Sequence, residues 1–566
     1  MEQYQGAEAF LEVLNSNGIE RVFFNPGGDL APIQAAVLRY RVLGKKAPRL
    51  VLCLHESVAL SAAHAHYMVT GKPQVVMVHS ELGSQQLGGA LHNAQWGRVP
   101  VVIFAGVAAA SHRLNWKNEA YDQGEMVRNS VKWDHEIAPG EDIHDALQKA
   151  FDIACSDPCG PVYLSYGRDV LGGMTIRREL ETREHTTPTL PAPPLDVIDR
   201  IASALVEAAH PLILVGYSGR HRETLPQLVE LAESLSAEVI SGLTRVNFPT
   251  THPLCAGIEQ MGSAGKPNSP LAEADAVLVL DYDAPYVPAS GMPNSETKVF
   301  HIDVDALTQG RPLWNREADV FLKADSRQAI SELIKAIRDK MTPEQKSQLQ
   351  ERFARLAARH EEERNERHDK AKYLSEQKPI SAEWVCRCIA DFIDDDTVVV
   401  NQLISQSRAF ADQFDRTEPG TLLSCAGGSI QWALGAGLGA KVAVSDKTVV
   451  SLMTDGGFVW GCPISTLWTA RSYDAPFLSV IFNNQSYGAI RRLVQNMTES
   501  DLSGDAGFYA GVDISPPPDY ALVAASCGAY GRMVEEPSEV LPALREALSE
   551  VRGGRAAVLD IRLAKG

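Results

Sequence analysis

The chain lacks several features that would point to other classes of protein. No run of 18 apolar residues occurs in its 566 residues, so no membrane-spanning helix is expected. Its nine cysteines are scattered. The one loosely spaced pair, Cys155 and Cys159, has no second pair near it, which argues against a zinc site. We therefore expect reduced and mostly buried thiols, as in a cytoplasmic enzyme.

Positive charge is also scarce. The chain has 53 Lys and Arg residues against 71 Asp and Glu residues, which gives a formal net charge of −18. This balance disfavours nucleic acid or an anionic membrane as a partner. Residues 1–10, MEQYQGAEAF, lack the basic start and apolar core of a signal peptide. With 45% hydrophobic and 22% charged residues, the composition is that of a soluble globular protein, and we expect it in the cytoplasm.

What the chain has in abundance is alternation between strand and helix patterns. The first 185 residues hold apolar strand patterns at residues 21–24, 50–54, 74–78, 99–105 and 161–165, with helical patterns between them. A Pro- and Thr-rich linker follows at residues 185–194, and the same alternation resumes in residues 195–340. Such βαβ repetition predicts α/β domains with doubly wound parallel sheets.

A charged segment separates the second of these units from a third. Residues 341–379 are rich in Glu, Arg, Lys and Gln, which predicts a solvated connecting helix. Residues 380–566 again alternate strands and helices. The predicted organisation is thus three doubly wound parallel-sheet domains at residues 1–185, 195–340 and 380–566, with a helical linker at residues 341–379.

One stretch of the third domain organises the functional prediction. Residues 449–453 form a buried strand pattern that ends in Thr454-Asp455-Gly456-Gly457. After a helical stretch, a second strand pattern at residues 477–482 ends in Asn483-Asn484. Because the carboxyl ends of parallel strands lie at one edge of a sheet, Asp and Asn side chains should meet there. Such oxygen ligands suit Mg²⁺ or Ca²⁺, and Mg²⁺ usually binds together with phosphates.

This stretch resembles the diphosphate motif of thiamine diphosphate (ThDP) enzymes, Gly-Asp-Gly followed after some 25 residues by Asn-Asn. Thr454 stands where the motif has its first Gly, a position that shapes the turn. The three-domain plan also resembles the acetolactate synthase and benzoylformate decarboxylase family over nearly the whole chain. The resemblance implies a pyrimidine-binding, a middle and a diphosphate-binding domain. It also implies ThDP, Mg²⁺, and a homodimer or homotetramer with active sites between subunits.

The family pattern implies roles for residues in two domains. Glu56 matches the glutamate that bonds the aminopyrimidine and promotes formation of the C2 ylid. Ile430 matches the apolar residue under the bent cofactor, and the Gly428 carbonyl would bind the 4′-amine. Asp455, Asn484 and the Ser486 carbonyl would bind the metal. The remaining cofactor contacts would come from Asn25, Pro26, Gly27, Gly456, Gly457, Tyr487 and Gly488.

Other positions concern the reaction and the substrate. His79 resembles the catalytic histidine of benzoylformate decarboxylases, and Gln123 matches a glutamine near the cofactor of acetolactate synthases. An imidazole at a strand end can relay protons near neutral pH. Gly28 stands where benzoylformate decarboxylases have a serine for the substrate carboxylate. The predicted substrate contacts are Gly28, His79, His92, Phe458 and Trp460, the last two in a slightly lengthened segment.

The resemblance implies decarboxylation of a 2-oxo acid through an enamine, which is then protonated or attacks a carbonyl acceptor. We expect no FAD, because residues 281–286 lack the arginines of the flavin-binding synthases. One alternative is a C–C lyase acting on a 2-hydroxyacyl-CoA or an acyloin, for which Arg245 and Lys266 are the nearby basic residues. The other alternative is a non-catalytic protein that keeps the ThDP fold.

Overall fold

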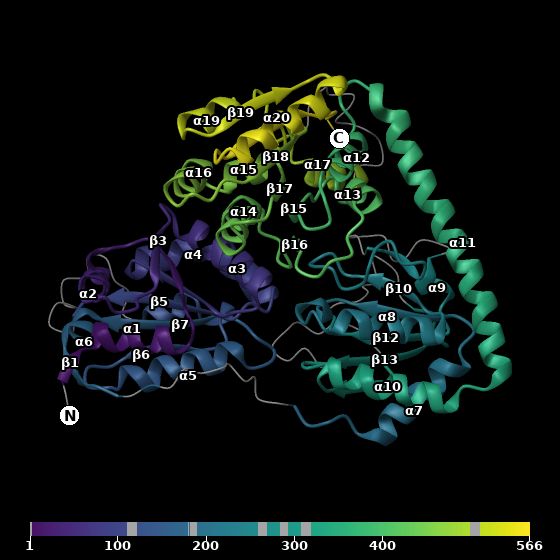
Figure 1. The fold of residues 1–566 in the computed structure, drawn as a ribbon, viewed down its shortest axis with the longest axis horizontal. Coiled ribbons are helices and arrows are strands. Elements are labelled where there is room, and N and C mark those ends of the chain that lie inside the picture. Colours follow the sequence, from purple (N-terminus) through teal and green to yellow (C-terminus); the bar gives the residue numbers. More distant parts are fainter. Residues whose placement is uncertain are drawn as a thin grey trace.

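A computed structural model describes residues 3–109, 122–178, 180, 190–258, 269–283, 293–306, 318–497 and 510–565. Three six-stranded parallel sheets form three α/β units, as the alternating patterns predicted (Figure 1). Residues 185–189, half of the predicted linker at residues 185–194, lie outside the described residues, as does Lys266.

The first sheet has the strand order β3-β2-β4-β5-β7-β6. Buried β-branched and aromatic residues form its inner strands, and helices cover both faces. A small antiparallel pair, β1 (Gln3–Gln5) with β8 (Met174–Ile176), closes the unit. The sheet strands are β2 (Arg21–Phe24), β3 (Arg49–Leu52), β4 (Gln74–Val78), β5 (Val101–Val107), β6 (Asp134–Ile137) and β7 (Val162–Gly167). The helices are α1 (Gly6–Ser16), α2 (Ala31–Val42), α3 (Glu56–Thr70), α4 (Ser80–Trp96), α5 (Ile143–Cys155) and α6 (Arg168–Gly172).

The middle sheet has the order β11-β10-β9-β12-β13-β14 and its own apolar core. Its strands are β9 (Pro211–Val215), β10 (Glu238–Ser241), β11 (Cys255–Ile258), β12 (Ala276–Leu280), β13 (Lys298–Asp303) and β14 (Val320–Lys323). Its helices are α7 (Leu195–Glu207), α8 (Thr224–Leu235), α9 (Pro270–Glu273) and α10 (Ser326–Lys340). The charged segment that follows is one long helix, α11 (Pro343–Tyr373), which starts with a Thr342–Gln345 capping box and runs along the edge of the molecule (Figure 1).

The third sheet, β16-β15-β17-β18-β20-β19, repeats the strand order of the first sheet. Its strands are β15 (Val398–Gln402), β16 (Leu422–Ser424), β17 (Val449–Thr454), β18 (Leu478–Asn483), β19 (Tyr530–Val534) and β20 (Ala557–Arg562). Its helices are α12 (Ala382–Phe392), α13 (Ser407–Gln413), α14 (Trp432–Ala443), α15 (Asp455–Trp460), α16 (Pro463–Ser472), α17 (Gly488–Met497), α19 (Tyr520–Ser526) and α20 (Val540–Arg552). Short 3₁₀ helices are η1 (Gly28–Leu30), η3 (Gln123–Met126), η4 (Arg128–Ser130), η5 (Ser218–Arg220), η6 (Leu374–Glu376) and η7 (Pro537–Glu539).

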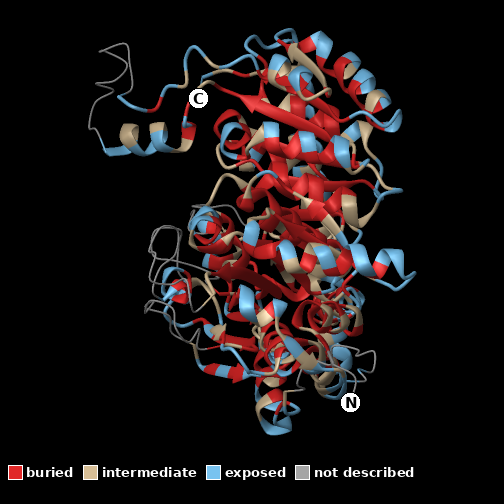
Figure 2. Ribbon diagram, turned by 90° about the vertical axis from the view of Figure 1, so that its left-hand side faces the viewer, coloured by how far each residue is buried: buried red, intermediate tan, exposed pale blue. Residues whose placement is uncertain are grey.

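Helices α3 and α14 join the first and third units at the centre of the molecule (Figure 1). Small residues allow this close approach: a Cβ added at Gly439 would lie 2.0 Å from the Ala62 carbonyl oxygen. Both helices are almost entirely buried, as are most of the inner strands of the three sheets (Figure 2). All nine cysteines are free thiols, as expected. Within the described part of the chain, no helix is long and apolar enough to cross a membrane.

Candidate functional site

The first sheet brings its predicted site residues to the carboxyl ends of β2 and β4. The turn beginning at Asn25 follows β2, and His79 follows β4. These two strands pair with each other, and the chain order reverses between them, so this is the topological switch point of the sheet. Ligands of open α/β sheets bind at such a point. The side chain of His79 is 31% exposed there.

Glu56 begins helix α3 at the neighbouring strand end. His55 caps this helix, because its Nδ1 accepts a hydrogen bond from the Ser57 backbone N–H at 3.2 Å. A carboxylate in the first turn is favoured by the helix dipole. Glu56 is nevertheless only 7% exposed and lies against the start of α4, where a Cβ added at Gly83 would be 3.0 Å from its Oε1. A buried carboxylate at this edge suits a group that bonds a ligand.

Gln123 and His92 lie in different surroundings. Gln123 is 1% exposed, and its Nε2 donates hydrogen bonds to the Tyr163 hydroxyl at 2.6 Å and to the Gly106 carbonyl at 3.3 Å. It therefore lies inside the first domain, and its catalytic role stays a prediction. His92 is exposed on α4 and faces the third domain, since a Cβ added at Gly427 would lie 3.0 Å from its ring.

The third sheet gathers the predicted metal ligands at the ends of β17 and β18. Asp455, Asn484 and Ser486 are 1%, 2% and 3% exposed. Asp455 Oδ1 accepts the Gly456 N–H at 2.8 Å, whereas Asp455 Oδ2 and Asn484 Oδ1 are buried with no hydrogen-bond partner among the described residues. The Ser486 carbonyl accepts the Gly488 N–H at 2.8 Å and keeps its second lone pair. Two orphaned oxygens and a carbonyl form the donor set that Mg²⁺ prefers.

Electrostatics at Asp455 point the same way. Burial raises its pKa to about 6, and the backbone N–H groups of Gly456, Gln485 and Ser486 offset only part of this effect. A buried carboxylate without a cation is unfavourable, and a divalent cation would compensate it. Across the described residues, no group of three His, Cys, Asp or Glu side chains offers a different metal site. The residues present therefore fit Mg²⁺.

Neighbouring residues fix the shape of this edge. The Thr454 hydroxyl accepts the Gly457 N–H at 3.2 Å and caps α15, so the residue that replaces the first Gly of the motif has a structural role. Asn483 donates from Nδ2 to Asp560 Oδ1 at 2.7 Å and points away from Asn484's orphaned oxygen toward β20. Its structural role was expected.

Ile430 lies close to the paired glycines that follow the predicted metal ligand Asp455. A Cβ added at Gly456 would be 3.7 Å from Ile430 Cδ1 and 2.9 Å from the Tyr487 ring. At Gly488 an added Cβ would lie 2.7 Å from Asn484 Nδ2, so this position also needs glycine. Ile430 is half-buried, and Gly428 is exposed with open space where a side chain would be.

A cavity of about 460 Å³ opens beside Gly428, between the middle and third domains. Its walls include Tyr217 and Tyr282 of the middle domain, Trp96 of the first, and residues 401–404 of the third. The one charged side chain among its described lining residues is Asp283, whose Oδ1 accepts a hydrogen bond from Arg98 at 2.7 Å. The cavity is therefore lined by aromatic, apolar and neutral polar groups.

Contacts between α4 and the loop before α14 join the first and third domains. Asn93 is fully buried and exchanges two hydrogen bonds with the Ser429 backbone, at 2.9 Å and 3.1 Å. On the other side of α3, the Cys462 thiol interacts with the Ser57 hydroxyl. Burial raises the pKa of this thiol, as does the nearby Glu56 carboxylate. Glu56 thus lies close to the segment that follows α15.

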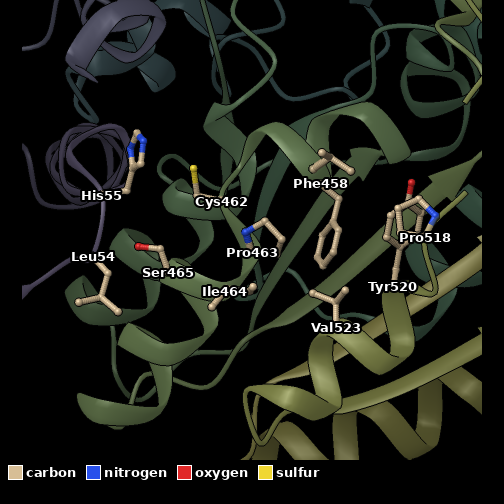
Figure 3. A pocket seen from close by; sticks show the side chains of 11 residues that line it. Leu54, His55, Phe458, Cys462, Pro463, Ile464, Ser465, Pro518, Tyr520 and Val523 are labelled. Atoms are coloured by element: carbon tan, nitrogen blue, oxygen red, sulfur yellow. The ribbon is translucent and has the colours of Figure 1, made fainter. Parts of the chain in front are cut away.

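Phe458 and Trp460, the predicted substrate contacts of α15, separate in the structure. Phe458 is fully buried, packs edge-on against Tyr520 and lines an apolar cavity of about 450 Å³ (Figure 3). Leu54, His55 and Cys462 lie across this cavity from Phe458. Trp460 is 52% exposed. Neither residue lines the cavity beside Gly428 in the described lining, and their contact with substrate stays a prediction.

Two contributors were missed by the sequence analysis. Asp29 accepts a hydrogen bond from His79 Nδ1 at 2.6 Å, although it lies 50 residues away in the chain. Asn93, next to His92, bonds the Ser429 backbone, a contact that was not predicted from the sequence. A turn aspartate directly after Gly27-Gly28 was the available signal for Asp29. Pairing it with His79 required knowing that β2 and β4 are adjacent.

Comparisons with known proteins agree with this geometry. Three family models match consecutive parts of the chain. They are described as thiamine pyrophosphate enzyme N-terminal TPP binding domain, central domain and C-terminal TPP binding domain, and they match residues 4–129, 198–333 and 404–561.

The chain is 26% identical to the acetolactate synthase isozyme 3 large subunit of Escherichia coli (strain K12), covering 99% of this chain and 95% of that one. It is 27% identical to a benzoylformate decarboxylase of Pseudomonas aeruginosa, covering 96% of both chains. A solved 4-hydroxybenzoylformate decarboxylase of Rhodococcus jostii RHA1 superposes with a TM-score of 0.79 at 25% identity over 100% of both chains. A benzoylformate decarboxylase structure from Polynucleobacter necessarius, at 22% identity and a TM-score of 0.81, shares the fold over 99% of both chains.

Proposed function

Because the chain belongs to the thiamine pyrophosphate enzymes of the acetolactate synthase and benzoylformate decarboxylase type, we propose that it is a Mg²⁺- and ThDP-dependent enzyme that removes CO₂ from a 2-oxo acid. The product is the aldehyde, or the coupled acyloin or acetohydroxy acid when a carbonyl acceptor is present. Bound ThDP supplies the carbon nucleophile and the electron sink for this chemistry. The chain supplies binding, orientation and proton control.

The observation that carries the proposal is the pair of orphaned buried oxygens, Asp455 Oδ2 and Asn484 Oδ1. They require a cation, and a cation at this strand edge holds a diphosphate. Ile430 lies close to the paired glycines, and Glu56 is buried at the edge of the first sheet. These two residues are the reason for proposing that the diphosphate at the cation belongs to ThDP. Glu56 is proposed to hold a proton at the aminopyrimidine nitrogen, and His79 to move one at the reacting carbon.

The direct experiment is turnover of a panel of 2-oxo acids, including pyruvate and benzoylformate, with ThDP and Mg²⁺. Released CO₂, aldehyde and coupled product are all measured. We expect CO₂ from at least one member, and at least about a hundredfold less from Glu56→Gln. The Glu125→Gln variant, at an exposed glutamate of the same domain, is the matched control and should keep full turnover. Absence of CO₂ from every member would reject the proposal.

No observation favours the CoA-dependent lyase alternative. Binding a nucleotide needs exposed basic side chains. Arg245 is only 7% exposed, and burial lowers its pKa. The described lining of the 460 Å³ cavity carries no basic residue. A non-catalytic protein would not need to bury Glu56, Asp455 and Asn484 at its sheet edges. Absence of FAD remains a prediction from the sequence.

We further infer that the chain works as a homodimer or homotetramer with its active sites at the subunit interface. Exposed apolar side chains gather at the 450 Å³ cavity beside the start of α3 (Figure 3). Leu54, Val459 and Ile464 line it and are 45%, 47% and 63% exposed. An exposed apolar patch of this kind indicates a protein interface. The residue directly before helix α3, which Glu56 begins, lines the same cavity, so the patch lies next to the proposed site.

A further inference from the structure

Asp29 carries a buried carboxylate in the first domain that the proposed function has not yet used. It lies in η1, is 2% exposed, and places Oδ1 2.6 Å from His79 Nδ1. Its second oxygen, Oδ2, is buried and has no hydrogen-bond partner within the described chain. Burying a carboxylate with one oxygen unbonded costs folding free energy. This cost indicates that the contact with the histidine has a function.

Two glycines make room for this pair of side chains. A Cβ added at Gly27 would lie 1.9 Å from His79 Nδ1 and 2.5 Å from Asp29 Oδ1. At Gly106, on β5, an added Cβ would lie 2.0 Å from Asp29 Oδ2. Any larger residue at either position would displace the pair. The ends of β2 and β5 therefore leave a space whose shape is filled by Asp29 and His79.

The charged and titratable groups around the pair come from three elements, α6, β7 and α3. Arg168, after β7, has its Nη2 3.4 Å from where a Cβ on Gly28 would be. The Tyr166 hydroxyl, on β7, is buried, and burial together with the Asp29 charge raises its pKa well above the usual value. Tyr163 on the same strand experiences the Asp29 charge too. Glu56 lies across Gly83, whose N–H donates to the His79 carbonyl at 2.6 Å.

We propose that Asp29 is a positioning residue for His79, fixing the imidazole as its Nδ1–H tautomer and leaving Nε2 for a ligand at the ends of β2 and β4. A carboxylate can only accept, so the hydrogen in the 2.6 Å contact belongs to Nδ1. Because Nδ1 is engaged, Nε2 is the nitrogen left for proton transfer. This inference rests on the proposed function.

The proposed proton transfer needs no acid or base other than His79 and water. The imidazolium gives its Nε2 proton to the substrate carbon that has lost CO₂, and the Nδ1–H stays bonded to Asp29. The ring is then neutral, and a proton from water restores it. When this carbon is protonated the aldehyde forms, and when it is not protonated it reacts with a second carbonyl. Asp29 thus influences which product the enzyme releases.

The kinetic test uses Asp29→Asn, Asp29→Ala, His79→Ala and the Asp29→Asn/His79→Ala double variant. We expect kcat for aldehyde to fall about a hundredfold in Asp29→Asn, with KM changed less than twofold. The aldehyde-to-coupled-product ratio should fall with it. The double variant should be no slower than His79→Ala alone, because both changes interrupt one path.

Asp142 provides a matched control. It accepts from His144 Nδ1 at 3.0 Å at the start of α5, the same kind of contact in another part of the domain. Asp142→Asn should keep turnover and product ratio. An Asp29→Asn enzyme with unchanged kcat and product ratio, while His79→Ala is impaired, would overturn the inference.

A second readout needs neither cofactor nor substrate. In protein labelled with ¹⁵N-histidine, the His79 signals are assigned by their loss in His79→Ala. We expect the Nδ1–H tautomer in the wild-type chain and a shift toward Nε2–H in Asp29→Ala. A wild-type His79 found as Nε2–H would overturn the inference even if the variants fail to fold. Absence of CO₂ from every 2-oxo acid would reject the proposed function. The spectrum would still decide the His79 tautomer, because it does not depend on turnover.

Discussion

Single residues decide how the candidate metal site responds to pH, and Asp455 is the main one. Burial raises its pKa from 3.8 to about 6. Its contribution to the stability of the metal-free chain is therefore fully present below pH 3.8 and is lost as the pH rises through about 6. The difference of about two pKa units corresponds to at most about 3 kcal/mol. A proton also competes with the cation, so Mg²⁺ should bind more weakly below pH 6.

Asp455→Asn tests this directly. Removing the charge should raise the thermal midpoint of the metal-free chain at pH 8, and the gap from wild type should widen between pH 4 and 7. The variant should also lose the stabilisation that Mg²⁺ and ThDP give the wild type. Thermal unfolding with and without both ligands measures these effects. A variant that is less stable than wild type at every pH, or that still responds to Mg²⁺ and ThDP, contradicts the assignment.

Gly27 tests the shape of the first strand edge. A methyl group at Gly27 would overlap His79 Nδ1 and Asp29 Oδ1, so Gly27→Ala should cut turnover at least about tenfold through the displaced imidazole. Gly172→Ala, in the same domain, is the matched control, because nothing lies within 4 Å of the methyl group it adds. Initial rates with the best 2-oxo acid compare the two. Equal rates would show that the close approach at Gly27 does not matter.

At the scale of elements, the contact between α3 and α14 joins the first and third domains of the chain. Gly439→Val should force these helices apart, since even a Cβ there would lie 2.0 Å from the Ala62 carbonyl oxygen. We expect destabilisation of about 2 kcal/mol or more and weaker ThDP binding. Gly172→Val, in α6 with nothing within 4 Å of the added Cβ, is the control. Chemical unfolding and ThDP titration check both variants. A fully stable Gly439→Val would argue against this packing.

Elements were predictable where local pattern determines them. The apolar runs at residues 21–24 and 74–78 are strands with the predicted bounds. Short edge strands such as β11 and β16 were missed, because their few residues carry no periodicity distinct from loops. Helix α4 starts directly after His79, with Ser80 at a positive φ. That tight strand-to-helix turn leaves no sequence signal.

The site was predictable to the extent that it follows from strand ends. Asp455 and Asn484 were expected at one sheet edge, and parallel pairing of β17 with β18 brings them there. The contact of Asp29 with His79 and that of Asn93 with Ser429 depend on packing between segments far apart in the chain. Periodicity and spacing carry no information about such pairs. The displacement of Phe458 into the interior likewise follows from its packing on Tyr520.

For the whole molecule, a buried ion network joins the first and middle domains. Arg98 bonds both oxygens of Asp303 at 2.9 Å and Asp283 at 2.7 Å, and it lies over the Tyr217 ring. Desolvation opposes the charged form of Arg98, yet the two carboxylates hold its pKa well above the usual value. The pKa of Asp303 is correspondingly lowered. All three charges depend on one another.

Removing Arg98 should therefore loosen the domains. Arg98→Met leaves two buried carboxylates unpaired, and we expect a loss of about 3 kcal/mol. It should also speed proteolysis between the first and middle domains. Arg178→Met removes an exposed arginine that pairs with Asp145 on the surface, and it should change little. Thermal unfolding and limited proteolysis compare the two variants. Equal stability of both would show that the network does not join the domains.

The apolar patch at the 450 Å³ cavity makes a prediction about assembly. Ile464→Asp places a charge in the proposed interface and should shift the chain toward monomers, with ThDP affinity reduced at least about tenfold. Leu38→Asp, which alters an equally exposed leucine on α2, should leave assembly unchanged. Light scattering after size exclusion measures the mass of each variant. A wild-type chain that is monomeric and active would contradict the proposed oligomer.

The central claim is that the assembled chains bind Mg²⁺-ThDP between the first-domain sheet edge of one subunit and the third-domain sheet edge of another, and activate it through Glu56. Exchange of the ThDP C2 proton for deuterium, followed by NMR after acid quench, tests the claim without requiring the substrate to be known. The wild-type chain with Mg²⁺ should accelerate this exchange strongly over free ThDP. Glu56→Gln should still bind the cofactor but slow the exchange at least about a hundredfold. Equal exchange rates in the wild type and Glu56→Gln would contradict the account.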